Sequence, residues 1–463
     1  MDALGPDVLV VGGGLAGLVA ASRAAELGGD VLLLDKGDLV SGGGNTLMTT
    51  GTYYAAGVSP SSSPDELYSR AMAGGAAHPV VAEAWANNCR RALEWLESTG
   101  ISIDRTGDTE PCLESNSSVS GSPVYRIDTG VHIVKKLLAF LQANRGASRS
   151  RTKVVKLLTK RGRVVGVEAV GGAGERITVA GKTTVLATGG FQANRELLSK
   201  FVGRRADKIK MMGSAAAKGD GLKMAVAVGA RPVNMKYFHG RMVALKALTD
   251  DKFWPYPTLD SLVEDGMVVN LAGQRFSDEG WGDVPLANIV SKWNDVTGAS
   301  LVFDEEAWVR SKGDKKSLVP PNPWLLEKGA GICKADTPGE LADKLGVNRR
   351  NLENTVEDFN TAATKRRLGE LPVPRITNTR PLKPPYYGLK IVPGIVATMG
   401  GPLIDGHARV RNGKGEAIPG LYAAGDLVGG LMGGRNGGYV GGISQAAVTG
   451  ILAGENAYKF ATG

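Results

Sequence analysis

Cysteine and histidine are both scarce in this sequence, and their scarcity argues against two kinds of site. The chain has 3 cysteines among 463 residues, and none of them forms a CxxC pair; they are Cys89, Cys112 and Cys333. An odd set without that pair predicts reduced thiols in a cytoplasmic protein and argues against a disulfide reductase. The 4 histidines lack the spacing of metal ligands, so we expect no metal site; they are His78, His132, His239 and His407.

Long apolar runs and a leader-like N-terminus are also missing. No apolar run approaches the roughly 18 residues of a transmembrane helix, and MDALGPDVLVV lacks the basic region of a signal peptide. We therefore expect neither a membrane span nor export. The net charge is +9, but the basic residues are scattered and their clusters lack interleaved aromatic residues. This pattern favours a solvated basic surface, which can attract anionic small molecules, over a nucleic-acid interface.

Glycine, by contrast, is abundant, and it is concentrated near the C-terminus. The chain has 65 glycines, and residues 420–442 read GLYAAGDLVGGLMGGRNGGYVGG. Each glycine in regular structure costs roughly 0.5–1 kcal/mol relative to alanine. Such a stretch therefore indicates a place where the main chain approaches a ligand closely.

Residues 7–36 have the pattern of a dinucleotide-binding βαβ unit. An apolar run leads into Gly12-x-Gly14-x-x-Gly17, an alanine-rich helical pattern follows, and a second apolar run ends at Asp35. The first glycine permits the turn, the second lets the backbone approach a pyrophosphate, and the third packs the helix on the strand. The helix N-terminus supplies amides and a positive dipole, and Asp35 would accept the ribose hydroxyls. This unit fits NAD, NADP and FAD alike.

The rest of the chain divides by composition. A second glycine loop, SGGGNTLMTTG, precedes helical patterns at 64–100 and 130–144, and residues 151–187 read as a β-meander that returns to a buried strand. Residues 241–387 hold most of the tryptophans and many prolines, and residues 388–463 return to a strand and a small-residue helix. We expect one domain from 1–240 and 388–463, with 241–387 inserted as a second.

The C-terminal stretch favours FAD among the three dinucleotides. A short strand ending in Ala423-Ala424-Gly425-Asp426 would carry a carboxylate to the ribitol and pyrophosphate region. A helix beginning near Gly442 would aim its amides at the pyrimidine carbonyl, where negative charge collects on reduction. The glycines between them leave room for a flavin ring and a substrate stacked on it.

Several motifs together resemble the fumarate reductase/succinate dehydrogenase-type flavoproteins, a superfamily that includes 3-ketosteroid dehydrogenases and tricarballylate dehydrogenase. The resemblance covers nearly the whole chain through DVLVVGGGLAGLVAA, GGGNTLMTTG, VLATGGF, VVNLAGQRFSDEG, ATMGG and IPGLYAAGDLVGG. It implies an α/β fold in which a Rossmann-like, three-layer FAD-binding domain, with a parallel sheet and a β-meander, carries an inserted α+β capping domain.

The resemblance also implies which residues hold FAD. They are Gly12, Gly14, Leu15, Ala16, Gly17, Asp35, Lys36, Gly44, Asn45, Thr46, Gly51, Ala187, Thr188, Gly189, Gly425, Asp426 and Gly442. Covalently flavinylated relatives carry a histidine in the loop after the second strand. That loop offers Gly44, Asn45 and Thr46 here, so we expect noncovalent FAD.

The expected reaction is desaturation of a carbon-carbon bond next to the carbonyl of a small ketone or carboxylate, with hydride transfer to the flavin. Soluble fumarate reductases place an arginine proton donor four residues beyond the glutamate of an RFxNE motif. Asp283 holds that position here, which favours proton abstraction over fumarate reduction; a solvated loop carboxylate is the alternative reading. Other candidate bases are Tyr125, Tyr53 and Tyr439, each with a packing role as its alternative.

Two further features bear on the substrate. Arg435 is the candidate clamp for a substrate carboxylate, with loop structure as its alternative role. Trp254 and Trp281 could line an apolar pocket or simply pack in the core. A reductase of an activated double bond, like fumarate or urocanate reductase, remains open, as does a flavin-binding protein without turnover. Without a second GxGxxG we expect no direct use of NAD(P)H, and the electron acceptor stays undetermined.

Overall fold

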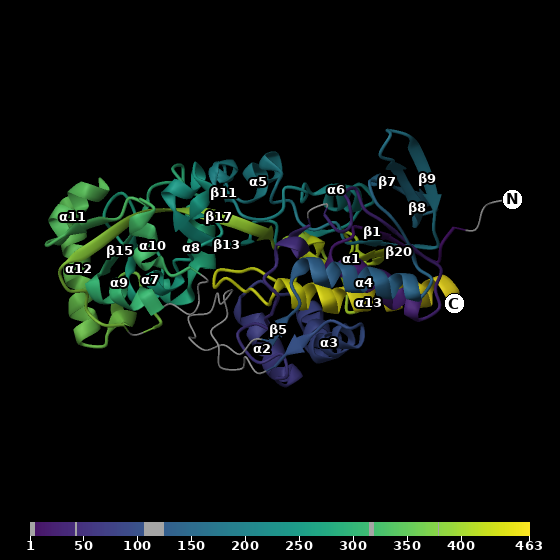
Figure 1. Cartoon of the computed structure of the whole chain (residues 1–463), viewed down its shortest axis with the longest axis horizontal. Helices are drawn as coiled ribbons and strands as arrows, with labels where there is room; N and C mark the ends of the chain where they lie inside the picture. The colour runs from purple at the N-terminus through teal and green to yellow at the C-terminus, as the bar shows by residue number, and fades with distance from the viewer. Residues whose placement is uncertain (1–4, 42–43, 106–124, 314–318, 378) are drawn as a thin grey trace.

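A computed structural model describes residues 5–41, 44–105, 125–313, 319–377 and 379–463. Cys112, expected as a reduced thiol, and residues 42–43 of the second glycine loop lie outside these ranges. Figure 1 shows an elongated molecule in which a parallel sheet and both chain ends lie at one end, and α9 to α12 lie at the other. The whole fold is mixed α/β.

The parallel sheet is built around the expected βαβ unit. Its order across the sheet is β19 (Arg409–Arg411), β20 (Ala417–Ala423), β10 (Thr183–Leu186), β1 (Val8–Val11), β2 (Val31–Leu34) and β6 (Ala147–Arg149). All neighbours pair in parallel except β19 and β20. Strand β1 is fully buried, as its apolar run predicts. Because the chain leaves β1 for β2 on one side and reaches β10 on the other, the strand order reverses at β1, and ligands bind at such points.

Helices and a small sheet pack on this parallel sheet (Figure 1). Helices α1 (Leu15–Glu26), α4 (Gly130–Ala143) and α13 (Gly442–Thr462) contact one another or the sheet, and α3 (Pro79–Ser98) packs on α13. The expected meander is β7 (Lys153–Lys160), β8 (Arg163–Val170) and β9 (Arg176–Ala180), and β8 packs against β10 and β20. The FAD-binding architecture expected from the sequence is therefore present.

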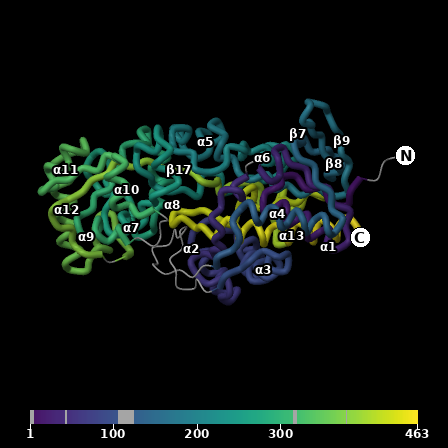
Figure 2. Tube along the Cα trace, in the orientation of Figure 1, coloured from purple at the N-terminus to yellow at the C-terminus, as the bar shows by residue number. Residues whose placement is uncertain are grey.

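A second sheet connects the two ends of the molecule. The strand β17 (Tyr386–Thr398) pairs with β13 (Phe238–Ala244), β15 (Ala299–Asp304), β11 (Lys210–Met211) and β16 (Cys333–Ala335), and β14 (Met267–Val269) pairs with β15. The tube in Figure 2 shows β17 running from the region of α12 towards the parallel sheet. The expected domain limits fall inside strands of this sheet, 240/241 within β13 and 387/388 within β17. The division of the chain into two domains stays a prediction.

The remaining elements are short. Around the second sheet lie α7 (Asp260–Asp265), α8 (Asp283–Val290), α9 (Glu305–Arg310), α10 (Pro321–Glu327), α11 (Pro338–Leu345) and α12 (Arg349–Thr364). Elsewhere lie α2 (Pro64–Ala73), α5 (Arg195–Phe201), α6 (Asp220–Ala227), and the strands β3 (Thr52–Tyr53), β4 (Ile103–Asp104), β5 (Tyr125–Ile127), β12 (Pro232–Val233) and β18 (Gly401–Pro402). None of the helices in the described ranges has the length and apolar character needed to cross a membrane.

Candidate active site

A cavity of about 550 Å³ lies where the strand order reverses at β1. It is lined by the β1–α1 turn, the loop after β2, the segment after β10, the strand β13, the end of β17 and the glycine-rich stretch after β20. Cavities of this size, about 300–1,000 Å³, are typical of small-molecule and cofactor sites. Segments from both ends of the sequence therefore meet at one binding site.

The βαβ unit forms one wall of this cavity. Gly12 has φ +110°, and a Cβ on it would lie 2.3 Å from the carbonyl oxygen of Ala187, so the turn accepts only glycine. Helix α1 begins after Gly14, and Thr46 Oγ1 accepts a hydrogen bond from its first amide, Leu15 N, at 2.9 Å, which leaves the next amides of the first turn for a ligand oxygen. The Asp35 carboxylate accepts hydrogen bonds from the amides of Gly13 (2.6 Å) and Gly37 (2.7 Å). These contacts hold the carboxylate at the cavity rim.

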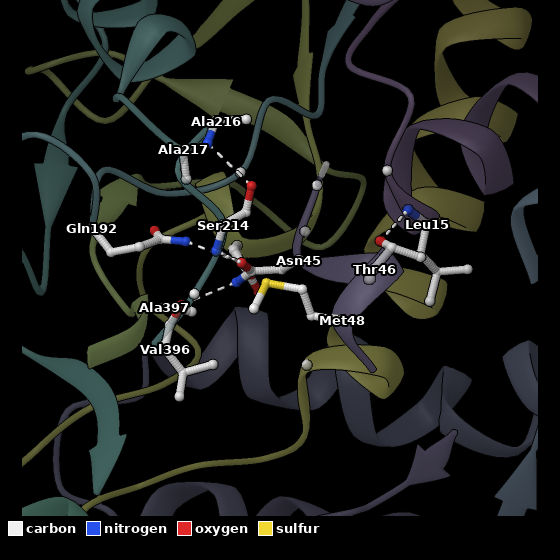
Figure 3. Close-up of a pocket in the computed structure, with 18 of the residues that line it drawn as sticks. Leu15, Asn45, Thr46, Met48, Gln192, Ser214, Ala216, Ala217, Val396 and Ala397 are labelled. Atoms are coloured by element: carbon white, nitrogen blue, oxygen red, sulfur yellow. Dashed lines mark hydrogen bonds between the residues drawn. The ribbon is translucent and has the colours of Figure 1, made fainter. Parts of the chain in front are cut away.

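Asn45 joins several segments at the middle of the cavity (Figure 3). Its Oδ1 accepts hydrogen bonds from Ser214 N (2.7 Å) and Gln192 Nε2 (3.3 Å), and its Nδ2 donates to Val396 O (3.1 Å) and Asp426 Oδ2 (3.4 Å). Sequence reasoning identified Asn45 but missed Gln192 and Ser214. A single amide therefore holds four separate segments around the site.

The C-terminal stretch supplies the opposite wall. Gly425, Asp426 and Gly442 all line the cavity. Burial raises the pKa of Asp426 to about 6, while the hydrogen bond from Asn45 acts in the other direction. Helix α13 begins at Gly442, and its first residues, Gly442 and Ile443, line the cavity.

Most of the expected FAD contacts meet in this one cavity. Those that line it are Gly12, Gly14, Leu15, Ala16, Asp35, Lys36, Gly44, Asn45, Thr46, Ala187, Thr188, Gly189, Gly425, Asp426 and Gly442. Gly17 and Gly51 do not line it. A Cβ on Gly17 would lie 1.8 Å from Gly12 O, and one on Gly51 would lie 2.3 Å from Ile127 O. These two glycines permit close backbone packing behind the cavity wall.

Beyond the expected cofactor contacts, β13 contributes two polar side chains that the sequence analysis did not assign. His239 and Arg241 are 4 % and 6 % exposed, and both line the cavity. Arg241 Nη1 donates to Asp260 Oδ2 at 2.7 Å. Burial, followed by the positive charge of Arg241, lowers the pKa of His239 to about 3, so its imidazole is neutral at neutral pH. Polar residues two apart in the otherwise apolar strand FHGRMVA were the available signal.

Asp283 lies behind this wall, outside the lining residues. It is the first residue of α8, is 1 % exposed, and its Oδ2 accepts a hydrogen bond from Met242 N at 3.3 Å. Its Oδ1 has no hydrogen-bond partner among the described residues. Burial, and then the negative charge of Asp260, raise the pKa of Asp283 well above its usual value. The carboxylate is therefore buried beside β13, where the sequence allowed a solvated loop residue.

The other catalytic candidates occupy different places. Tyr439 lines the cavity, with its ring stacked on His239 at 4.0 Å between centroids and on Tyr54 at 5.7 Å. The Tyr439 hydroxyl accepts a hydrogen bond from Gly442 N at 2.8 Å. Tyr125 is buried away from the cavity, with its hydroxyl 2.7 Å from Ser61 Oγ, and Arg435 is exposed and does not line the cavity.

The structure also places Tyr53 and the two candidate pocket tryptophans. Tyr53 is fully buried, and its hydroxyl donates to Cys89 O at 2.9 Å, which is a packing role. Trp254 lines the cavity, whereas Trp281 does not. Among the described residues, no group of three or more His, Cys, Asp or Glu side chains is arranged to hold a metal ion.

The family assignment follows from the match of the whole chain. The model of the FAD binding domain family matches residues 7–443. The chain belongs to this family. It is an FAD-dependent oxidoreductase, and fumarate reductases are among its curated relatives.

Two curated relatives and one solved structure show the range of this family. The chain is 29% identical to NADH:fumarate oxidoreductase of Klebsiella pneumoniae (strain 342), covering 99% of this chain and 48% of that protein, so it spans about half of that relative. It is 27% identical to 4-oxocyclohexanecarboxylate 2-dehydrogenase of Sinomonas cyclohexanicum, covering 91% and 87%. The 3-ketosteroid-delta4-(5alpha)-dehydrogenase of Rhodococcus jostii RHA1 has the same fold, with a TM-score of 0.76, 22% identity, and 98% and 97% coverage.

The residues of the cavity fit FAD. The N-termini of α1 and α13, whose first amides donate to Thr46 Oγ1 and to the Tyr439 hydroxyl, would offer their next amides to the pyrophosphate and to a flavin carbonyl. Gln192 lines the cavity, is 2 % exposed, and has a buried Oε1 without a hydrogen-bond partner among the described residues. Noncovalent attachment stays a prediction.

Proposed function

We propose that this chain reduces a carbon-carbon double bond conjugated to a carboxylate or ketone. The observation that carries the proposal is the buried Arg241, which is paired with Asp260 and lines the same cavity as the FAD contacts. A guanidinium in a desolvated site stabilises negative charge that develops on a substrate oxygen. An unsaturated carbonyl compound develops such charge when hydride adds to its β-carbon.

The placement of charge in the wall supports this direction. Fumarate reductases carry an arginine at the position of Asp283, but in this chain the aspartate lies behind β13 and accepts from Met242 N. The cation comes from Arg241 on the neighbouring strand instead. Asp283 does not line the cavity, so a negative charge on it would not repel an anionic substrate there. For the same reason Asp283 is a weaker candidate for the proton acceptor.

In this mechanism the side chains bind the substrate and move one proton. FAD, when bound and in its two-electron-reduced form, would supply the hydride for the β-carbon. The Arg241 guanidinium donates hydrogen bonds to the substrate oxygen, and Asp260 fixes its orientation. The Tyr439 hydroxyl gives its proton to the α-carbon. The amide of Gly442 and the N-terminus of α13 stabilise the remaining negative oxygen, while His239 stacks on the ring and restricts its movement.

Desaturation of a saturated carbonyl compound is the second candidate. It is favoured by the position of Tyr439 in the cavity, because the same hydroxyl, once deprotonated, could accept the α-proton. The relative from Sinomonas cyclohexanicum, a dehydrogenase, supports this candidate, and the relative from Klebsiella pneumoniae supports the first.

Anaerobic spectroscopy of the FAD-loaded protein separates the two. Dithionite-reduced protein, freed of excess reductant, is mixed with an enoate or enone panel, and oxidised protein is mixed with the saturated counterparts. We expect the unsaturated compounds to restore the oxidised flavin band at rates at least tenfold above those at which saturated compounds bleach it. Bleaching by a saturated ketone without reoxidation by any unsaturated compound would establish the second candidate. Tyr439→Phe should slow the productive reaction about 10²-fold, the usual contribution of a proton-transfer group.

A further inference from the structure

We infer that the substrate carries one carboxylate or carbonyl group on a flat apolar ring, and that the segment 254–258 selects this ring. The inference rests on the proposed function for the reaction and adds the class of substrate. The segment joins β13 to α7 and places Trp254, Pro255, Tyr256 and Thr258 along the cavity. It therefore forms a wall next to the Arg241–Asp260 pair, because Asp260 follows Thr258 by two residues.

The cations that line the cavity divide into two groups. Among the described lining residues, Lys36 and Lys153 lie beside Asp220, at 2.6 Å and 4.0 Å, in the part formed by β2 and the meander. Arg241 is the cation on the β13 wall. Its neighbour His239 is neutral, since its pKa is about 3, and Arg435 is exposed away from the cavity. The β13 wall thus provides one cation where a short dicarboxylate would require two.

The rest of this wall suits an apolar ring. Trp254, Tyr256 and Tyr439 present aromatic surface, and Met432 adds a flexible apolar side chain. Aromatic side chains gain from offset or edge contacts with another ring, beyond the area they bury. A four-carbon dicarboxylate would leave most of this surface without a partner.

Binding titrations test the inference without turnover. The oxidised holoenzyme is titrated with 3-phenylpropanoate, 3-(4-hydroxyphenyl)propanoate, butanoate and succinate, and the perturbation of the flavin spectrum gives each Kd. We expect both ring acids to bind at least tenfold more tightly than succinate and butanoate. Tighter binding of succinate would overturn the inference, whatever the turnover results are.

Two tryptophan variants locate the selective wall. Trp254→Ala should reduce the preference for 3-phenylpropanoate over butanoate about tenfold, because it removes the aromatic surface. Trp281→Ala is the matched control, since Trp281 is a tryptophan from the same inserted stretch that does not line the cavity; it should leave that ratio unchanged. An equal loss in both variants would contradict the role of segment 254–258.

The reaction has a readout separate from the titrations. In turnover, cinnamate should reoxidise the reduced protein faster than fumarate. If fumarate alone reoxidises the protein, the inference is wrong and the proposed function stands. If no unsaturated compound reoxidises it, the proposed function is wrong, and the binding titrations still test whether segment 254–258 selects a ring.

Discussion

The charged groups at the β13 side of the cavity are the Arg241 guanidinium and the carboxyl groups of Asp260 and Asp283. Arg241 and Asp260 form a buried pair at 2.7 Å, and Asp283 lies against the neighbouring amide of Met242. Removing one partner of a buried pair leaves an uncompensated charge, whereas replacing Asp283, a carboxyl group whose pKa burial raises, with a neutral side chain should cost less. Substitution of Asp260 should therefore destabilise the protein more than substitution of Asp283, although the two residues lie in one cluster.

Asp283→Asn and Arg241→Gln form a direct comparison. Because Asp283 lies outside the cavity and burial raises its pKa, the neutral asparagine should retain kcat/KM within about threefold. Arg241→Gln should lower kcat/KM about 10²-fold, since it removes a charged donor to the substrate oxygen. Steady-state kinetics with the best enoate of the panel measures both. A large loss in Asp283→Asn with an unchanged melting temperature would restore the aspartate as the proton-transfer residue.

Asp426 gives the cavity a pH dependence. Its pKa is about 6 in the folded chain against 3.8 for the ordinary carboxyl group, so the folded state holds the proton more tightly. This stabilisation is complete below pH 3.8 and is lost as the pH rises through about 6. Thermal unfolding of FAD-depleted protein between pH 4.5 and 7.5 should show a decline in stability that is smaller in Asp426→Asn. Identical slopes in the two proteins would assign the decline to other groups.

Among the secondary-structure elements, the turn from β1 to α1 combines two distinct uses of glycine. Gly17 sits against the backbone, where a Cβ would lie 1.8 Å from Gly12 O. Gly14 instead lines the cavity, and a Cβ there would lie 3.4 Å from Thr46 Oγ1, which is an ordinary contact. One glycine therefore serves packing, and the other leaves room for the cofactor.

This difference predicts opposite outcomes for two identical substitutions. Gly17→Ala should destabilise the fold by about 2 kcal/mol or more, because the backbone must shift. Gly14→Ala should keep the folding stability of the FAD-depleted protein but weaken FAD binding at least tenfold. Chemical denaturation and fluorescence titration with FAD provide the two readouts. Equal FAD affinity in Gly14→Ala and the parent protein would show that the cofactor does not approach this turn.

Over the whole molecule, a buried ion cluster lies in the part of the chain farthest from the parallel sheet. Glu279 is fully buried; it accepts from Arg275 at 3.0 Å and 2.5 Å and lies 3.7 Å from Arg375. Both guanidinium groups also face the ring of Phe359, at 5.6 Å and 5.9 Å. The glutamate of the RFSDEG motif therefore ties the second sheet to α12 rather than contacting the cavity.

Glu279→Gln tests whether this cluster stabilises the inserted part selectively. Two buried arginines would lose their counter-charge, and we expect a loss of about 3 kcal/mol. Five of the seven tryptophans lie in residues 241–387, so tryptophan fluorescence reports mainly on this part, while release of FAD reports on the parallel-sheet part. The tryptophan transition should shift to lower temperature more than FAD release does. Equal shifts would indicate that the two parts unfold together.

Local patterns were enough to predict most of the segments that meet at the cavity. The turn around Gly12, the acidic residue Asp35 and the short strand before Asp426 are contiguous motifs whose spacing reflects backbone geometry. The same holds for the meander and for the helix after Gly442. Because these features depend on residues close in sequence, they are readable before the chain is folded.

The substrate side depended on contacts that spacing along the chain does not encode. Counting residues placed Asp283 at the reactive position, but the packing of α8 on β13 turns its carboxylate towards the amide of Met242. Arg241 stands at an expected domain limit, and it reaches the cavity because β13 pairs with β17, which lies far along the chain and places Gly394 opposite Arg241. Charge compensation and desolvation are properties of side chains brought together by folding, and so the tertiary structure alone decided which charged side chain lines the cavity.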